Sequence, residues 1–219
     1  MRAFSGSYTV LAVAGALSAA GCLRKDVTHT IYVSPAGVTW STIEKDVRSD
    51  EPDPATRLLE EQDVILGARA GQHGVARALR ALGATRVETT MLRTDRPFTI
   101  VTDGRFTDLG DLARAMLRQA HVRGDASIDR NGCERTFRAW IDAESNEGQD
   151  SDALSALLDG TTQYRLVLTE GRFVRAEGFA IEEDGSVATP SASLEPEDGV
   201  VRVSLTWTEG RCDPVRRSW

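Results

Sequence analysis

The alternation of apolar and polar side chains in the last third of this 219-residue chain most constrains its fold. In residues 201–207, four apolar side chains share one face of an extended strand and three polar side chains share the other: Val201, Val203, Leu205 and Trp207 against Arg202, Ser204 and Thr206. Residues 164–168 and 173–181 also have the pattern of strands, and residues 189–199 are expected to form a connecting loop. Short turns between these strands predict a mainly antiparallel sheet.

Strand patterns also occur earlier in the chain. A hairpin is predicted around a turn at residues 34–37, and further strands are predicted at residues 86–91, 98–106 and 137–141. An acidic residue followed by glycine recurs in a short motif: Asp103-Gly104, Glu170-Gly171 and Glu209-Gly210. Because glycine tolerates positive φ, we interpret each copy as a tight hairpin turn.

Helical periodicity is found in three regions, at residues 54–82, 109–120 and 151–160. The first helix is expected to begin after Asp53, and the glycines of residues 71–74 are expected to interrupt it. The second has the clearest apolar face, with Thr107 or Asp108 as its cap. Because strands outnumber helices, the sequence predicts an α+β fold with a mainly antiparallel β-sheet and about three helices.

The composition fits a folded domain. The apolar fraction of 41% and the mixed charges exclude a disordered or collagen-like chain. The net charge of −7 is spread along the chain, which argues against a nucleic-acid-binding protein. The length suits one domain, and the alternative is two small domains divided near residues 124–150.

The N-terminal residues have the pattern of a secretory signal. Arg2 is followed by an apolar run at residues 10–17 and by small residues, and no acidic side chain occurs before Asp26. The apolar run is shorter than the stretch of about 20 residues that spans a bilayer. We therefore expect residues 1–21 to be a cleaved signal peptide and residues 22–219 to be the exported domain.

The end of this signal, Ala19-Ala20-Gly21-Cys22, resembles the lipobox of bacterial lipoproteins. The resemblance covers the signal only. It implies cleavage before Cys22, acylation of the Cys22 thiol by palmitate or a similar chain, and a lipid anchor in the cell membrane. Leu23 in place of Asp implies the outer membrane in a cell that has one. Ala19 stands where the class prefers Leu, which leaves an ordinary signal-peptidase site after Ala20 or Gly21 as the alternative.

The other two cysteines, Cys133 and Cys212, form an even pair if Cys22 carries lipid. Exported proteins fold in an oxidising compartment, so we expect these two residues to form a disulfide. Metal binding is the alternative, but neither a CxxC motif nor clustered histidines accompany the pair.

The sequence lacks the common catalytic motifs GxSxG, GxxxxGK[ST], HExxH and GxGxxG. His29, His73 and His121 lie far apart, and surface or capping roles are expected for the last two. An acidic stretch departs from the EF-hand pattern and is interpreted as a solvated loop: Asp142, Glu144, Glu147, Asp150 and Asp152. The sequence therefore predicts no catalytic residue, no metal and no cofactor.

These patterns predict a lipid-anchored protein of the cell envelope that binds or scaffolds without catalysis. Its expected partner is the membrane, nucleic acid is not expected, and the protein or ligand partner is unspecified. One alternative is a hydrolase whose site is assembled from distant residues, which a cluster of His73 or His121 with carboxylates in a cleft would favour. The other is a lipid-handling protein, which predicts a large apolar pocket under the terminal strands.

Overall fold

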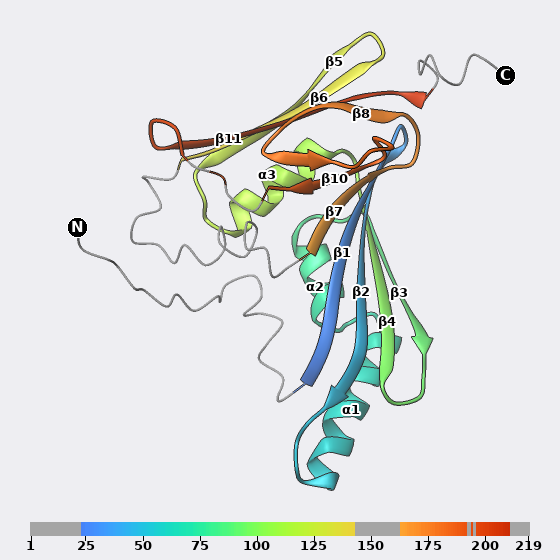
Figure 1. The fold of residues 1–219 in the computed structure, drawn as a ribbon. Helices are drawn as coiled ribbons and strands as arrows, with labels where there is room; N and C mark the ends of the chain where they lie inside the picture. The colour runs from blue at the N-terminus through green and yellow to red at the C-terminus, as the bar shows by residue number, and fades with distance from the viewer. Residues whose placement is uncertain (1–22, 143–162, 192–193, 195, 211–219) are drawn as a thin grey trace, which may run out of the picture.

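The computed structural model describes residues 23–142, 163–191, 194 and 196–210. Within these residues the chain forms two sheets and three helices, and the predicted α+β fold with mainly antiparallel strands is confirmed (Figure 1). The expected signal peptide and the predicted helix at residues 151–160 lie outside the described residues.

The large sheet has seven strands, and all of its pairs except β1 with β7 are antiparallel. Its strands are, in spatial order, β3 (Arg86–Arg93), β4 (Phe98–Phe106), β2 (Gly37–Ser49), β1 (Leu23–Ser34), β7 (Gln163–Leu168), β10 (Val187–Pro190) and β9 (Phe179–Ile181). The hairpin of β1 and β2 forms around the turn predicted at residues 34–37, and Val33 pairs with Val38 across it.

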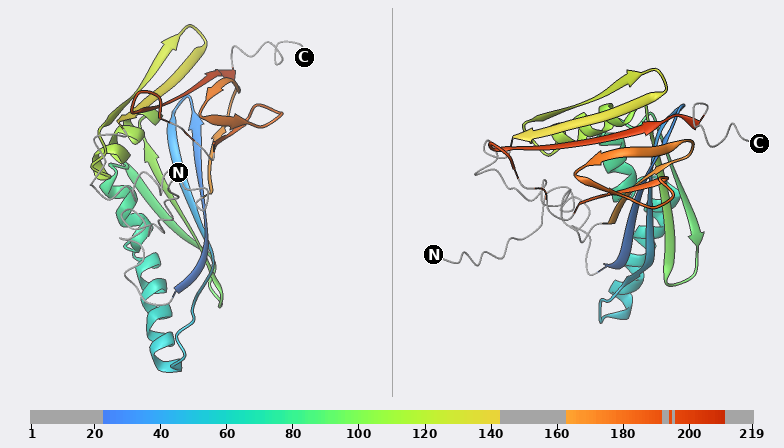
Figure 2. Two further views of the ribbon diagram at one scale, coloured as in Figure 1. Left: turned by 60° about the vertical axis from the view of Figure 1, so that its left-hand side comes forward. Right: turned by 45° about the horizontal axis from the view of Figure 1, so that its top comes forward.

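The small sheet has four antiparallel strands and lies across one end of the large sheet (Figures 1 and 2). Its strands are, in spatial order, β5 (Gly124–Asn131), β6 (Glu134–Asp142), β11 (Val200–Thr208) and β8 (Arg172–Glu177). The single strand predicted at residues 173–181 is wrong, because Gly178 adopts a φ of +75° there. At this residue the chain leaves β8 in the small sheet and enters β9 in the large sheet.

The three helices lie on the same face of the large sheet (Figure 2, left). They are α1 (Pro54–Arg69), α2 (Gly74–Ala81) and α3 (Leu109–Gln119). The predicted caps are present, since the Asp53 carboxylate accepts a hydrogen bond from the Thr56 N–H and the Asp108 carboxylate accepts one from the Asp111 N–H. The break predicted at residues 71–74 separates α1 from α2.

Two further sequence-based interpretations differ from the structure. Asp103 and Gly104, interpreted as a hairpin turn, lie inside β4, which pairs with β2 and β3 on its two sides. Helix α1 does not bury its leucines, because Leu58, Leu59 and Leu66 are exposed while Glu61 and Ala68 are its buried residues.

The main core lies between the inner faces of the two sheets and under α2 and α3. It is one cluster of buried side chains that draws on both sheets, with members that include Ile31, Trp40, Leu79, Leu112, Phe137, Leu166 and Leu205. Two features of the inner face of the large sheet interrupt this apolar packing, and both lie next to Tyr164.

Candidate functional site

The first feature is a row of polar side chains that crosses the inner face of the large sheet. His29 of β1 is paired with Tyr164 of β7 on one side and with Thr42 of β2 on the other. Thr42 is in turn paired with Thr102 of β4. Because directly paired residues of adjacent strands lie on the same face of a sheet, these four side chains are neighbours.

His29 is enclosed by aromatic rings and is 8% exposed. Its ring stacks on Tyr164 with the centroids 5.0 Å apart, and Trp40 meets its edge. The indole N–H of Trp40 donates to His29 Nδ1 at 3.2 Å, and Thr42 Oγ1 lies 2.9 Å from the same nitrogen. An indole nitrogen can only donate, so Nδ1 of His29 is unprotonated and the ring is neutral.

Burial lowers the pKa of His29 to about 4, against an opposing effect of the negative charge of Glu44. Burial likewise raises the pKa of Tyr164 to about 12. Both side chains are therefore uncharged at neutral pH. The centre of the row offers hydrogen-bonding groups without a net charge.

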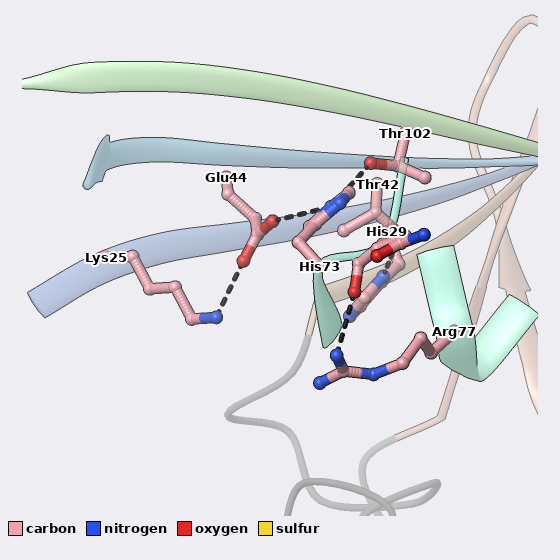
Figure 3. A network of polar contacts seen from close by, with 8 residues as sticks. Lys25, His29, Thr42, Glu44, His73, Arg77 and Thr102 are labelled. Carbon is pink, nitrogen blue, oxygen red and sulfur yellow. Dashed lines mark hydrogen bonds and ion pairs between the residues drawn. The ribbon is translucent and has the colours of Figure 1, made fainter. Parts of the chain in front are cut away.

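Glu44 follows Thr42 on the same face of β2 and is 4% exposed. Figure 3 shows its carboxylate between Lys25 and His73. Lys25 Nζ lies 2.6 Å from one carboxylate oxygen, and His73 Nε2 lies 3.5 Å from the other. The Lys25 ammonium supplies the countercharge that a buried carboxylate needs.

His73 is the residue that directly precedes α2, and its side chain links this helix to the sheet. Its Nε2 lies 2.9 Å from Thr102 Oγ1 as well as near Glu44. Burial is the main cause that lowers the pKa of His73, and the charge of Glu44 acts in the opposite direction. Among the described residues, no group hydrogen-bonds the buried Nδ1 of His73.

The structure therefore joins His29 and His73, which are far apart in the sequence, through Thr42, Glu44 and Thr102. This convergence with a carboxylate is what the hydrolase alternative requires. However, Glu44 is 4% exposed and Thr102 is 1% exposed, so these groups offer little surface to a substrate. The cluster is best described as a polar connection between α2 and the large sheet.

The other residues named from the sequence lie elsewhere. His121 follows α3 with a φ of +55°, a conformation common just after the end of a helix. Asp142 ends β6 beside Arg123, and the rest of the acidic stretch lies outside the described residues. Within the described part of the chain, no group of three or more His, Cys, Asp or Glu side chains is placed to hold a metal ion.

The cysteine predictions fall largely outside the described residues. Cys22 and Cys212 both lie beyond them, so lipidation and the disulfide stay predictions. Cys133 lies in the turn between β5 and β6, and its carbonyl accepts a hydrogen bond from the Glu209 N–H at 3.0 Å.

The second feature is an apolar cavity of about 150 Å³ between α3 and the two sheets. Its wall is formed by side chains of α3, β6, β7 and β11, together with neighbouring residues: Ile31, Leu109, Leu112, Ala113, Met116, Leu117, Phe137, Ala139, Ile141, Tyr164, Leu166, Gly178, Phe179, Pro190, Leu194, Val201 and Val203. Tyr164 is the one member of this wall whose side chain carries a polar group. Because Tyr164 also stacks on His29, it joins the cavity to the polar row.

A cavity with this lining suits an apolar ligand. An engineered cavity of about the same volume, lined by apolar side chains, stays dry and binds benzene. Among the described residues, no charged side chain lines this cavity. Its chemistry therefore favours hydrocarbon over a charged or strongly polar group. No local sequence pattern marks the cavity, because its wall is assembled from α3 and several strands of both sheets, each with the apolar pattern of an ordinary core element.

Comparisons with known proteins assign this chain to no family. No protein-family profile matches the chain, and no curated protein sequence matches it. Among solved structures, the NMR structure of the folded domain of the LppM protein of Mycobacterium tuberculosis is similar at a TM-score of 0.37 and 17% identity, over 91% of this chain and 95% of that chain. A TM-score this low carries no argument about function. Within the described residues, no helix is long and apolar enough to cross a membrane.

Proposed function

We propose that this chain is a lipid-anchored protein of the cell envelope whose domain binds part of a lipid alkyl chain in the cavity under β11. The observation that carries the proposal is the apolar wall of the cavity, in which Tyr164 is the one described lining residue with a polar side-chain group. The position of the cavity also matches the sequence-based expectation for a lipid-handling protein, since Val201 and Val203 of the terminal strand line it. The lipid anchor at Cys22 is part of the proposal.

The apolar lining of the cavity supports this function. The described residues of its wall offer few of the hydrogen-bonding partners that bound water needs. An alkyl chain restores the missing apolar contacts and contributes about 0.8 kcal/mol for each buried methylene. The volume accommodates a group of the size of benzene, so a stretch of chain rather than a whole lipid is the expected occupant.

Binding of a fluorescent fatty acid tests the proposal. We expect cis-parinaric acid to gain fluorescence with the protein and to lose affinity about ten-fold or more when Ala139→Phe fills the cavity. Ala180→Phe is the matched control, because Ala180 is exposed on β9 beside the cavity residue Phe179. Equal affinity of the Ala139→Phe variant and the natural protein would contradict the proposal.

A second variant tests whether another segment of the same chain fills the cavity. The sequence of residues 151–160 carries three leucines at helical spacing, between β6 and β7, which both line the cavity. If the fatty acid binds only to the variant that combines Leu154→Ser, Leu157→Ser and Leu158→Ser, then the leucines of this segment fill the cavity in the natural protein and no ligand does. Binding that is unchanged in the triple variant supports the ligand.

A further inference from the structure

Helix α1 presents three leucine side chains to solvent. Leu58, Leu59 and Leu66 are 56%, 62% and 62% exposed, whereas Glu61 and Ala68 are the buried residues of the helix. Leu59 and Leu66 are seven residues apart and therefore lie on one side of the helix. We name these three side chains the leucine face of α1. With a glutamate buried and three leucines exposed, α1 departs from the usual amphipathic surface helix, which buries its apolar side.

Polar contacts fix α1 in this orientation. The Glu61 carboxylate accepts hydrogen bonds from the Ser49 N–H at 3.1 Å and from Arg96 Nε at 2.8 Å, and the Ser49 hydroxyl donates to Glu60. The Arg96 guanidinium also donates to the Ser49 carbonyl at 3.0 Å. Rotation of the helix to bury its leucines would break these contacts and leave a carboxylate and an arginine unpaired. The leucine face is thus held outward by the fold itself.

The leucine face lies at the end of the molecule where the lipid anchor is expected. Cys22 directly precedes Leu23, and Leu23 pairs with Ser49, which contacts the middle of α1. The strand pairing and this contact place Leu23, the residue that follows Cys22 in the sequence, within about 15 Å of Glu61 in the middle of α1. The views agree that the start of β1 and α1 share one end of the molecule (Figures 1 and 2).

We infer that the leucine face of α1 lies on the bilayer that holds the acylated Cys22. The inference rests on the lipid anchor of the proposed function, but not on the cavity. With no residue between Cys22 and the first described residue of β1, the anchor holds this end of the domain against the membrane surface. An exposed apolar helix face at that distance enters the boundary between headgroups and acyl chains, as amphipathic interfacial helices do. Lipid, rather than a second protein, is therefore its partner.

Photo-crosslinking on vesicles tests this contact. p-Benzoylphenylalanine is incorporated in place of Leu59 in the acylated full-length protein, which is reconstituted in vesicles of phosphatidylcholine with tritium-labelled acyl chains. The matched control carries the same residue in place of Val174, which is 46% exposed on β8 of the small sheet. We expect at least about five-fold more labelled lipid on the protein from position 59 than from position 174.

Flotation of the same vesicles separates the outcomes. If the protein fails to float, the anchor is absent and the membrane contact of α1 is refuted with it. If the protein floats but positions 59 and 174 take up equal label, the anchor stands and the leucine face is not on the bilayer. A crosslinked product of twice the chain mass from position 59, without labelled lipid, shows that a second copy covers this face and also overturns the inference.

Discussion

His29 shows how burial of one side chain sets the pH dependence of this fold. Its pKa is about 4 in the folded chain against an ordinary value of 6.5, because burial disfavours the charged ring. Between these two values the unfolded chain binds a proton that the folded chain does not, so unfolding becomes more favourable as the pH falls. The stabilisation is complete above pH 6.5 and is lost progressively toward pH 4.

Urea unfolding at pH 7.5 and pH 4.5 measures this effect. We expect the free energy of unfolding to fall by roughly 2–3 kcal/mol between the two pH values through His29 alone. In the His29→Phe variant, which retains an aromatic ring beside Tyr164, this part of the fall should be absent. The variant also loses the hydrogen bonds to Thr42 and Trp40. The quantity compared between the two proteins is therefore the fall in the free energy of unfolding from pH 7.5 to pH 4.5, and not the free energy itself. The same fall in both proteins would refute the assignment to His29.

The convergence of His29 and His73 could not be predicted from the sequence. Both histidines are isolated in the sequence, and only the pairing of β1, β2 and β4 brings their surroundings together. One signal was present, because Thr42 and Glu44 continue the face of β2 on which Val38 and Trp40 are buried. Polar residues at positions that should be buried indicate a polar partner across the sheet.

Among the elements, those with strong periodicity were predicted and those without it were missed. The alternation of β11 and the apolar face of α3 each gave the correct element. β5 was missed because Ala126 is its one buried residue, so it lacks an apolar pattern. β10 was missed because it is short and its last two residues, Thr189 and Pro190, were assigned to the loop predicted at residues 189–199. Both segments are strands because they pair with neighbouring strands, and not because their own sequences favour the extended conformation.

Gly104 illustrates how tertiary packing overrules a turn signal. This residue lies in β4, under α2, and a Cβ added to it would stand 3.1–3.3 Å from three side-chain atoms of Leu79. Such contacts are tighter than ordinary van der Waals packing, so a side chain at this position would force α2 away from the sheet. The glycine is needed here for the close approach of a helix and not for a turn.

A double-mutant cycle tests this close approach. Gly104→Val should lower the free energy of unfolding by about 1–3 kcal/mol through overpacking against α2. Leu79→Ala should lower it by about 2–4 kcal/mol on its own, because it leaves a cavity. In the double variant the new side chain occupies the space of the removed one, so the total loss should be smaller than the sum. Additive losses in urea or thermal unfolding would show that the two residues do not compete for space.

At the scale of the whole molecule, the chain moves repeatedly between the two sheets. After β7 in the large sheet it enters β8 in the small one, returns for β9 and β10, and ends the described fold in β11. The apolar pattern of each strand predicts a buried face but not the sheet that the strand joins, which depends on the packing of the entire core. The cavity follows from this arrangement, since both sheets contribute to its wall.

The predicted disulfide would connect two distant parts of this topology. The Glu209 N–H donates to the Cys133 carbonyl at 3.0 Å, so the end of the described chain passes beside the turn that carries Cys133. Cys212 is three residues further on, a distance of at most about 10 Å along the chain. A disulfide requires Cα atoms within about 7 Å, which this reach allows.

Single and double cysteine variants test the bridge by their lack of additivity. A disulfide that closes a loop of roughly 80 residues stabilises a fold by about 4–5 kcal/mol in the chain-entropy model. Cys133→Ser and Cys212→Ser should each lower the free energy of unfolding by about this amount, and the double variant should lose no more than either one, because each change removes the same bond. A reductant should weaken the natural protein to the level of the variants and leave the variants unchanged. If the natural protein is insensitive to the reductant, Cys133 and Cys212 are not joined, and the fold is stabilised by its core without a covalent link between the β5–β6 turn and the end of β11.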